Sequence, residues 1–154
     1  MMRDDWKRVR VIANYQFGRG AGIALFPEKP EIHYSRTGRI RQILYQGRRI
    51  ATLKTDGLLT LSIEGAMMLH RYLPYPRMRV GVGDEAARFV RDGKNAFARH
   101  VVEVDPEIRA LDEVLIVDRS DNLLGTGKAL LSAAEMLSFR RGVAVSVRAG
   151  VGAR

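Results

Sequence analysis

The chain has 154 residues and a mass of 17.3 kDa, enough for one medium domain or two small ones and too short for a (β/α)₈ enzyme barrel of about 250 residues. Its composition, 46% hydrophobic and 28% charged, is typical of a globular protein. The chain contains no cysteine, which excludes disulfides, thiolate nucleophiles and sulfur-ligated zinc, and no segment resembles a signal peptide or a membrane span. We therefore expect a cytoplasmic location and no membrane partner.

The formal net charge is +9, and 21 of the 26 basic residues are arginines. Residues 1–76 carry 13 basic and 6 acidic side chains, a net charge of +7, whereas residues 77–154 carry 13 and 11, a net charge of +2. Guanidinium groups match phosphate bidentately and stack on bases, so nucleic acid is the first partner to consider. The alternative is that arginine richness reflects genome composition or heat adaptation.

The first predicted element is a helix over residues 5–17, capped by Asp4 or Asp5 and ended at Gly18. Apolar side chains recur there at helical spacing, and we expect them to be buried: Trp6, Val9, Ala13 and Phe17.

Residues 39–63 contain three β-leaning runs separated by the turns Gln46-Gly47 and Asp56-Gly57. This pattern predicts a three-stranded antiparallel meander, followed by a helix over residues 64–73. Pro74 and Pro76 then interrupt regular structure. The sequence thus predicts a small N-terminal α+β domain over residues 1–74.

The second half begins with a predicted strand over residues 78–82 and a helix with Asp84 as N-cap, buried Ala86, Phe89 and Val90, and Gly93 as terminator. Apolar runs predict strands over residues 97–104, 113–117 and 123–130. Ser132 and Glu135 form a capping box for a short helix that ends at residues 140–142, and residues 143–148 alternate as a last strand. We expect residues 77–150 to form a compact β-barrel with two short helices, giving the chain an α+β fold class.

Familiar catalytic patterns are missing. His33, His70 and His100 lie 37 and 30 residues apart, without metal-ligand spacing. Residues 125–129, Gly-Thr-Gly-Lys-Ala, lack the other residues of a phosphate loop and indicate a strand in close contact with its neighbour. The glycines at 18, 20 and 22 follow no strand, so they indicate a turn and not a dinucleotide site. We expect no catalytic residue, no metal and no cofactor.

Two features are open to more than one interpretation. The run from Ser35 to Arg41 places Arg36, Arg39 and Arg41 within six residues, either as an RNA contact or as a solvated strand edge. Phe97 could stack on a base, but its position on an alternating strand favours burial in the core.

Several segments of the second half resemble the PUA domain, an RNA-binding module, in order and spacing. They are residues 92–99 (DGKNAFAR), 104–109 (VDPEIR), 112–117 (DEVLIV), 127–132 (GKALLS), 135–136 (EM) and 141–145 (RGVAV). In the first half, four segments resemble the small domain that precedes PUA in archaeal tRNA-guanine transglycosylase. They are residues 15–18 (YQFG), 20–22 (GAG), 35–41 (SRTGRIR) and 55–57 (TDG).

The resemblance implies an RNA cleft lined by the helix after residue 83, the loop that follows it and the final strand. The RNA-binding residues that it implies are Arg88, Arg91, Gly93, Lys94, Asn95, Arg99, Arg141 and Arg148, with the Arg36, Arg39 and Arg41 cluster as a further contact. The turn at residues 92–95 should offer flexible backbone donors. In the alternative, Arg88 and Arg91 only form ion pairs with Asp84, Glu85 and Asp92.

The family's guanine-exchange chemistry belongs to a zinc-containing barrel for which this chain has no room. We therefore expect a non-catalytic protein that binds RNA, in particular tRNA, and that serves as an accessory subunit of a tRNA-modifying enzyme such as the archaeosine transglycosylase. One alternative is a protein adaptor on ribosomes or pre-ribosomal particles. Another is an enzyme whose site is assembled from scattered Asp, Glu and Arg residues.

Overall fold

The computed structural model describes residues 4–153 and divides into two compact units, one ending at Tyr72 and the other beginning at Leu73. Both units combine helices with sheets, so the predicted α+β class is confirmed. Within the described part of the chain, no helix has the length and apolar character needed to cross a membrane.

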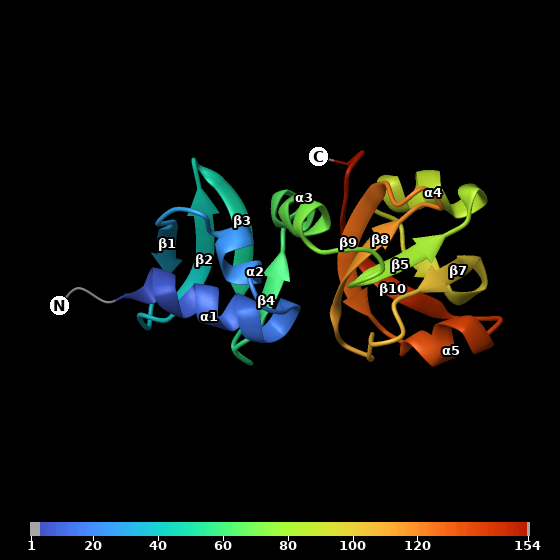
Figure 1. Cartoon of the computed structure of the whole chain (residues 1–154), viewed down its shortest axis with the longest axis horizontal. Coiled ribbons are helices and arrows are strands. Elements are labelled where there is room, and N and C mark those ends of the chain that lie inside the picture. The colour runs from blue at the N-terminus through green and yellow to red at the C-terminus, as the bar shows by residue number, and fades with distance from the viewer. Residues whose placement is uncertain (1–3, 154) are drawn as a thin grey trace. The chain divides into compact units, whose positions relative to one another are not determined.

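The N-terminal unit is a four-stranded antiparallel sheet with three helices (Figure 1). The strands lie in the order β1-β2-β3-β4. The elements are α1 (Asp5–Phe17), α2 (Ala21–Leu25), β1 (Glu31–Tyr34), β2 (Ile40–Tyr45), β3 (Arg48–Leu53), β4 (Leu59–Leu61) and α3 (Ile63–Tyr72). The predicted three-stranded antiparallel meander is confirmed as β2, β3 and β4, and the sheet also contains β1, which was not predicted. β1 is an edge strand whose residues are mostly exposed, so it has no hydrophobic alternation that could identify it.

Helix α1 spans the predicted residues and ends at Gly18, whose φ of 112° lies outside the helical region. Val9, Ala13 and Phe17 are buried as expected. Trp6 is only partly buried, and the Arg10 guanidinium lies 4.9 Å from the centroid of its ring.

Gln16 and the close approach at Gly22 provide two of the contacts between α1 and its neighbours. The Gln16 side chain forms a pair of hydrogen bonds with the backbone of Leu59 on β4, accepting from its N–H at 2.7 Å and donating to its carbonyl at 2.9 Å. At Gly22 on α2, an added Cβ would lie 2.4 Å from the Arg10 carbonyl oxygen. Only glycine allows this close approach of α1 and α2.

The C-terminal unit is a six-stranded sheet in the order β6-β10-β9-β8-β5-β7, with β5 and β8 parallel and the other pairs antiparallel. The elements are β5 (Arg79–Val82), α4 (Asp84–Arg91), β6 (Ala96–Phe97), η1 (Ala98–His100), β7 (Val101–Val104), β8 (Glu113–Val117), β9 (Leu123–Ala129), α5 (Ala133–Ser138) and β10 (Val143–Gly150). The predicted capping box of Ser132 and Glu135 is present at the start of α5.

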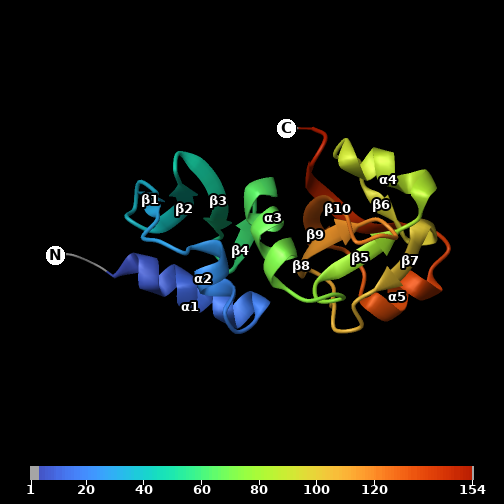
Figure 2. The ribbon, with the colours of Figure 1, turned by 45° about the horizontal axis from the view of Figure 1, so that its top comes forward.

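The predicted strand over residues 97–104 is broken into β6, the 3₁₀ turn η1 and β7. β6 and β7 lie at opposite edges of the sheet order, although η1 alone separates them in the chain. The sheet must therefore curve until its edges approach each other, giving the barrel-like form expected (Figure 2).

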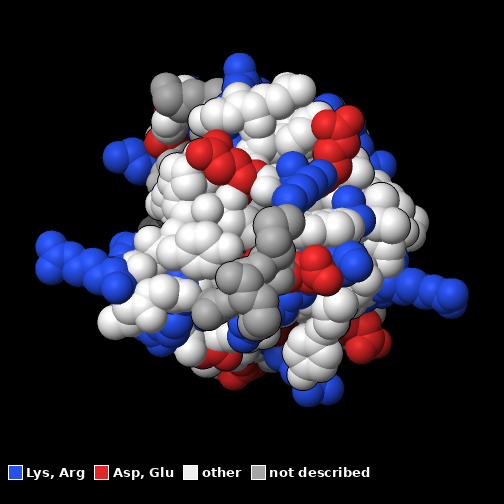
Figure 3. Space-filling model, turned by 90° about the vertical axis from the view of Figure 1, so that its left-hand side faces the viewer, with Lys and Arg blue, Asp and Glu red and all other residues white. Residues whose placement is uncertain are grey.

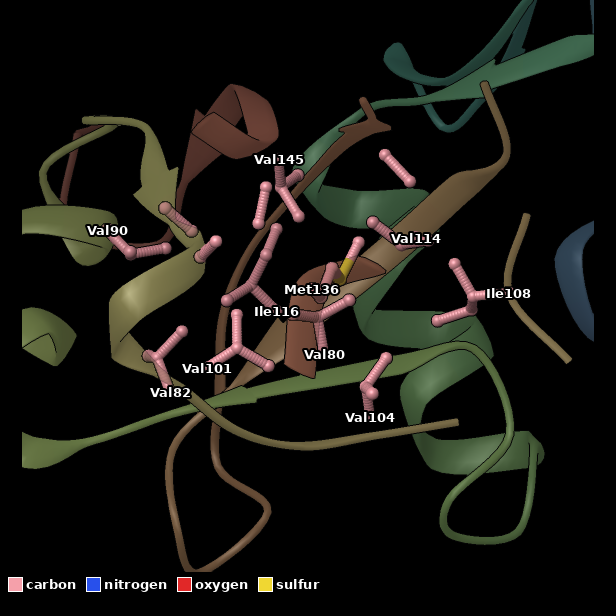
Figure 4. Packing of buried hydrophobic residues seen from close by; sticks show 14 of the residues in the cluster. Val80, Val82, Val90, Val101, Val104, Ile108, Val114, Ile116, Met136 and Val145 are labelled. Atoms are coloured by element: carbon pink, nitrogen blue, oxygen red, sulfur yellow. The ribbon is translucent and has the colours of Figure 1, made fainter. Parts of the chain in front are cut away.

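The barrel interior is filled by aliphatic side chains (Figure 4). Val80 and Val82 from β5 meet Val114 and Ile116 from β8, and Met136 from α5 closes the cluster. All five side chains are almost fully inaccessible to solvent.

Strands β9 and β10 approach each other more closely than side chains would allow. An added Cβ at Gly127 would lie 2.1 Å from the Ser146 carbonyl oxygen, and one at Gly125 would lie 2.6 Å from that of Ala149. The interpretation of residues 125–129 as a strand in close contact with its neighbour is confirmed.

Arg79 is 3% exposed and holds the segment that enters the C-terminal unit. Its Nη1 donates to the carbonyls of Leu73 and Arg77, each at 3.0 Å, while its Nε donates to Asp121 at 3.1 Å. Tyr75, in the same connector, forms a hydrogen bond with Glu103, which together with burial raises the pKa of Tyr75 to about 12. The two-proline connector is therefore a bound segment of the C-terminal unit.

A second ion pair crosses the sheet from β10 to β8. Arg148 and Glu113 form a bidentate pair in which Nη2 lies 2.7 Å from Oε1, and the Glu113 side chain is only 4% exposed against 31% for Arg148. A carboxylate this deeply buried is stable in its charged form only with a partner.

We expect Arg148→Ala to lower the free energy of unfolding by about 2 to 3 kcal/mol, below the 3 to 5 kcal/mol typical of a fully buried pair, because Arg148 is partly exposed. The double variant Glu113→Ala Arg148→Ala should cost less than the sum of the two single variants. Urea denaturation measures both quantities. The exposed Arg141→Ala is the control, with an expected change within about 0.5 kcal/mol; strictly additive effects of the pair would contradict a direct coupling.

Candidate nucleic-acid interface

Helix α4 exposes its basic side chains and buries its small ones. Gly83, and not Asp84 as predicted, occupies the N-cap position, and Asp84 is the first helical residue. Ala86 and Val90 are buried, whereas Arg88 and Arg91 are exposed.

Phe89 differs from its prediction as a core residue, since it is 48% exposed. It immediately precedes Val90, and adjacent positions on a helix point about 100° apart, so both cannot face the same core. The Arg88 guanidinium lies 4.9 Å from the centroid of the Phe89 ring, within cation–π range.

The loop after α4 is rigid at its start. The N–H of Gly93 donates to the Val90 carbonyl and that of Lys94 donates to the Phe89 carbonyl, both at 2.9 Å, which is the hydrogen-bond pattern of a Schellman motif. Gly93 adopts the positive φ of 90° that this motif requires. The expectation of flexible backbone donors at these two residues is therefore wrong, and the loop presents the exposed Lys94 side chain instead.

Asn95 attaches the same loop to β10. Its Oδ1 accepts a hydrogen bond from the backbone N–H of Val147 at 3.0 Å, continuing the edge of β10 beyond the two-residue strand β6. The side-chain oxygen of Asn95 is therefore engaged in attaching the loop to β10. The side-chain NH₂ group is the part of Asn95 that can donate to a ligand.

Phe97 is 41% exposed, so the interpretation of its side chain as core is wrong. The Arg99 guanidinium lies 5.7 Å from its ring centroid, and His100 packs edge-on against it at 6.3 Å. An exposed aromatic ring beside an arginine is the usual platform for stacking an unpaired base.

Arg141 reaches the same region from the start of β10. The Ala98 N–H donates to the Gly142 carbonyl at 2.9 Å, and Phe97 pairs with Val143 in the sheet. At the other end of β10, the Arg91 carbonyl accepts from the Gly152 N–H at 2.8 Å. The segment from Arg91 to Arg99 therefore runs along one edge of β10 from end to end.

We call the exposed side chains along this line the β10-edge surface. Its members are Arg88, Phe89, Arg91, Lys94, Phe97, Arg99 and Arg141. It brings together five of the eight residues expected in this half to contact RNA. Of the other three, Gly93 and Asn95 shape the loop, and the Arg148 guanidinium is bound to Glu113.

The basic groups of α4 are not neutralised by their neighbours on the helix. Among residues 4–153, neither Arg88 nor Arg91 forms an ion pair with Asp84, Glu85 or Asp92, contrary to the alternative interpretation. The charge of Arg91 does act on Asp118, in the turn between β8 and β9. Burial alone would raise the pKa of Asp118, but hydrogen bonds from Asn122 and Ser120, together with the positive charge of Arg91, lower it below its ordinary value.

The N-terminal unit contains the other cluster of residues expected to contact RNA, that of Arg36, Arg39 and Arg41. Beside it lies a concave site of about 650 Å³, which we call the N-terminal hollow. Arg39 and Arg41 line it, and Arg36 does not. Arg41 is the extra residue of a β-bulge, since Tyr34 pairs with Ile40 and His33 pairs with Gln42. The full lining is Asp5, Arg8, Ser35, Gly38, Arg39, Ile40, Arg41, Thr52, Leu53, Lys54, Thr55 and Gly57.

Sequence reasoning did not identify Arg8 or Lys54 as partners of this cluster, because they lie about 30 residues before it and 13 residues after it, with no pattern that links them. Among residues 4–153, no group of three or more His, Asp or Glu side chains could hold a metal ion.

Two family matches cover nearly the whole chain. Residues 7–76 match the patch-forming domain C2 of tRNA-guanine transglycosylase, and residues 78–151 match the PUA domain. Among solved structures, a hypothetical protein from Pyrococcus horikoshii superposes with a TM-score of 0.74 at 22% identity, covering 97% of this chain and 92% of the other. A conserved PUA domain protein from Thermoplasma acidophilum gives 0.68 at 20% identity, with 97% and 91% covered. These two likenesses concern the fold alone.

Curated relatives are closer in sequence. The tRNA-guanine(15) transglycosylase of Pyrococcus furiosus is 53% identical over 144 residues, which are 93% of this chain and 24% of the relative. That of Methanothermobacter thermautotrophicus is 50% identical, over 96% of this chain and 23% of the relative. The chain spans about a quarter of the length of these relatives. With a C2 domain followed by a PUA domain, the chain resembles the C-terminal part of archaeal tRNA-guanine(15) transglycosylases.

Proposed function

We propose that this chain is an RNA-binding protein that holds tRNA for a transglycosylase-type modifying enzyme and has no guanine-exchange activity of its own. The observation that carries the proposal is the match of both domains to relatives whose name states that they act on tRNA. The net charge of +9 supports a polyanionic partner.

The β10-edge surface is the proposed RNA contact of the PUA domain. Its five basic side chains supply phosphate contacts, and Phe89 and Phe97 supply exposed rings on which unpaired bases can stack. Gly93 and Asn95 contribute by shaping the loop. Arg148 contributes through its ion pair, which fixes β10. Arg36, Arg39 and Arg41 are a second contact in the C2 domain.

Charge reversal of Arg91 and Lys94 should weaken tRNA binding more than tenfold, which is about 1.4 kcal/mol. The melting temperature should change little, because both side chains are exposed and neither forms an ion pair with a described residue. The matched control reverses Lys29 and Arg109, also an exposed lysine and arginine, with the same change in net charge. Filter binding or fluorescence anisotropy measures the affinities. Equal losses of affinity in the two variants would indicate a nonspecific charge effect and would contradict an RNA contact at Arg91 and Lys94.

Binding should weaken steeply with salt. If the five basic residues of the β10-edge surface each neutralise one phosphate, log K against log salt has a slope of about −4, at 0.7 to 0.9 per contact. The Arg91 and Lys94 reversal should make this slope shallower by about 1.5. An affinity that is nearly independent of salt would contradict the electrostatic basis of the proposal.

The isolated chain should not incorporate labelled guanine into tRNA, even with zinc added, because it has no cysteine ligand and no length for a catalytic barrel. Adding a catalytic transglycosylase subunit that lacks C2 and PUA domains should produce incorporation that depends on this chain. Turnover by the chain alone would overturn the accessory role. Stable copurification with ribosomal particles, without stimulation of the catalytic subunit, would favour the adaptor alternative.

A further inference from the structure

The N-terminal hollow concentrates positive charge from three separate parts of the chain. Arg8 comes from the first turns of α1, Arg39 and Arg41 from the β1–β2 turn and the start of β2, and Lys54 from the end of β3. Figure 3 looks onto the side of Figure 1 where α1 begins, and shows basic side chains spread over this face with acidic ones among them. The lining of the hollow itself contains four basic side chains and one acidic side chain.

Most of this charge is not neutralised. Of the described residues that line the hollow, Asp5 alone is acidic. Lys54 pairs with Asp56 at 3.1 Å, but Arg8, Arg39 and Arg41 form no ion pair with any described residue. Three guanidinium groups around one concavity repel each other, and an anion bound between them would relieve that repulsion.

Asp5 offsets only part of the basic charge of the lining, which contains four basic side chains. Its side chain is 6% exposed, and its Oδ2 accepts a hydrogen bond from the Tyr34 hydroxyl at 2.7 Å. It also lies in the first turn of α1, where the helix dipole offsets a negative charge. The carboxylate is therefore committed to holding α1 against β1.

The remaining lining suits a phosphate with an organic group attached. Ser35, Thr52 and Thr55 bring hydroxyls to the wall, and hydroxyls donate to phosphate oxygens as guanidinium groups do. The hollow has a volume of about 650 Å³. This lies within the usual range for small-ligand sites and leaves space beside a phosphate for a sugar.

We propose that the N-terminal hollow binds the phosphate group of a nucleotide, with Arg8, Arg39 and Arg41 as its ligands. The nucleotide is either free or part of a bound RNA. The RNA source rests on the proposed function, whereas the free source does not.

The test uses the full chain labelled with ¹⁵N and four probes: inorganic phosphate, adenosine 5′-monophosphate, adenosine and a tRNA transcript. Phosphate and the monophosphate should give saturable shifts of the amide signals of residues 35–41 and 52–57, and adenosine should not. Arg39→Gln Arg41→Gln should weaken monophosphate binding at least tenfold. The matched control, Arg19→Gln Arg71→Gln, changes two exposed arginines of the same unit outside the hollow and should weaken it less than twofold.

A second pair of variants keeps the test independent of the β1–β2 turn. Arg8→Gln removes the ligand on α1, and Lys7→Gln removes an exposed neighbour outside the lining. Only Arg8→Gln should weaken monophosphate binding. Shifts that do not saturate, lie elsewhere or persist in Arg39→Gln Arg41→Gln would overturn the proposal.

The tRNA probe identifies the source of the phosphate. A parallel loss of tRNA affinity in Arg39→Gln Arg41→Gln supports a nucleotide within RNA, and unchanged tRNA affinity supports a free nucleotide. Absence of tRNA binding by the unmodified chain would overturn the proposed function. The monophosphate titration would still test whether the hollow binds a nucleotide phosphate. Reversal of Arg91 and Lys94 should leave the monophosphate-induced shifts of residues 35–41 and 52–57 unchanged, which separates the two sites.

Discussion

The backbone edge of β10 determines where the basic and aromatic side chains of the PUA domain lie. Three hydrogen bonds fix the segment from Arg91 to Arg99 along it: Gly152 N–H to Arg91, Val147 N–H to Asn95, and Ala98 N–H to Gly142. The strand itself is held against β9 at distances that tolerate only glycine at 125 and 127. The end of α4, the loop after it and the two-residue strand β6 are thus all attached to a single strand and the residues that flank it.

The distribution of charge between the two halves is a poor guide to local fields. The second half has a net charge of only +2, yet several of its carboxylates are engaged away from the β10-edge surface, as in the pairs of Arg79 with Asp121 and Arg148 with Glu113. Of the exposed basic groups along β10, Arg91 acts on Asp118, and neither Arg88 nor Lys94 forms an ion pair with a described residue. In the first half, part of the larger surplus converges on one hollow.

Elements with a regular pattern could be predicted from sequence. α1 follows its apolar spacing, β8 its unbroken apolar run, and α5 its capping box. β1 could not be predicted, because an exposed edge strand needs no alternation. The exposure of Phe97 could not be predicted, because η1 interrupts the strand and the alternation of buried and exposed residues does not continue through it. The ion pair of Arg148 with Glu113 could not be predicted either, because the two residues are 35 positions apart in the chain and meet only in the folded sheet.

The Schellman motif after α4 has a consequence for how fast a ligand can be captured. Because the backbone of Gly93 and Lys94 is already ordered, binding there immobilises side chains at about 0.5 to 1.5 kcal/mol each and requires no folding of the loop. Association can then proceed at the rate set by diffusion and electrostatic attraction, as for other preformed sites. Differences in affinity among ligands of this surface would accordingly lie in how long each one stays bound.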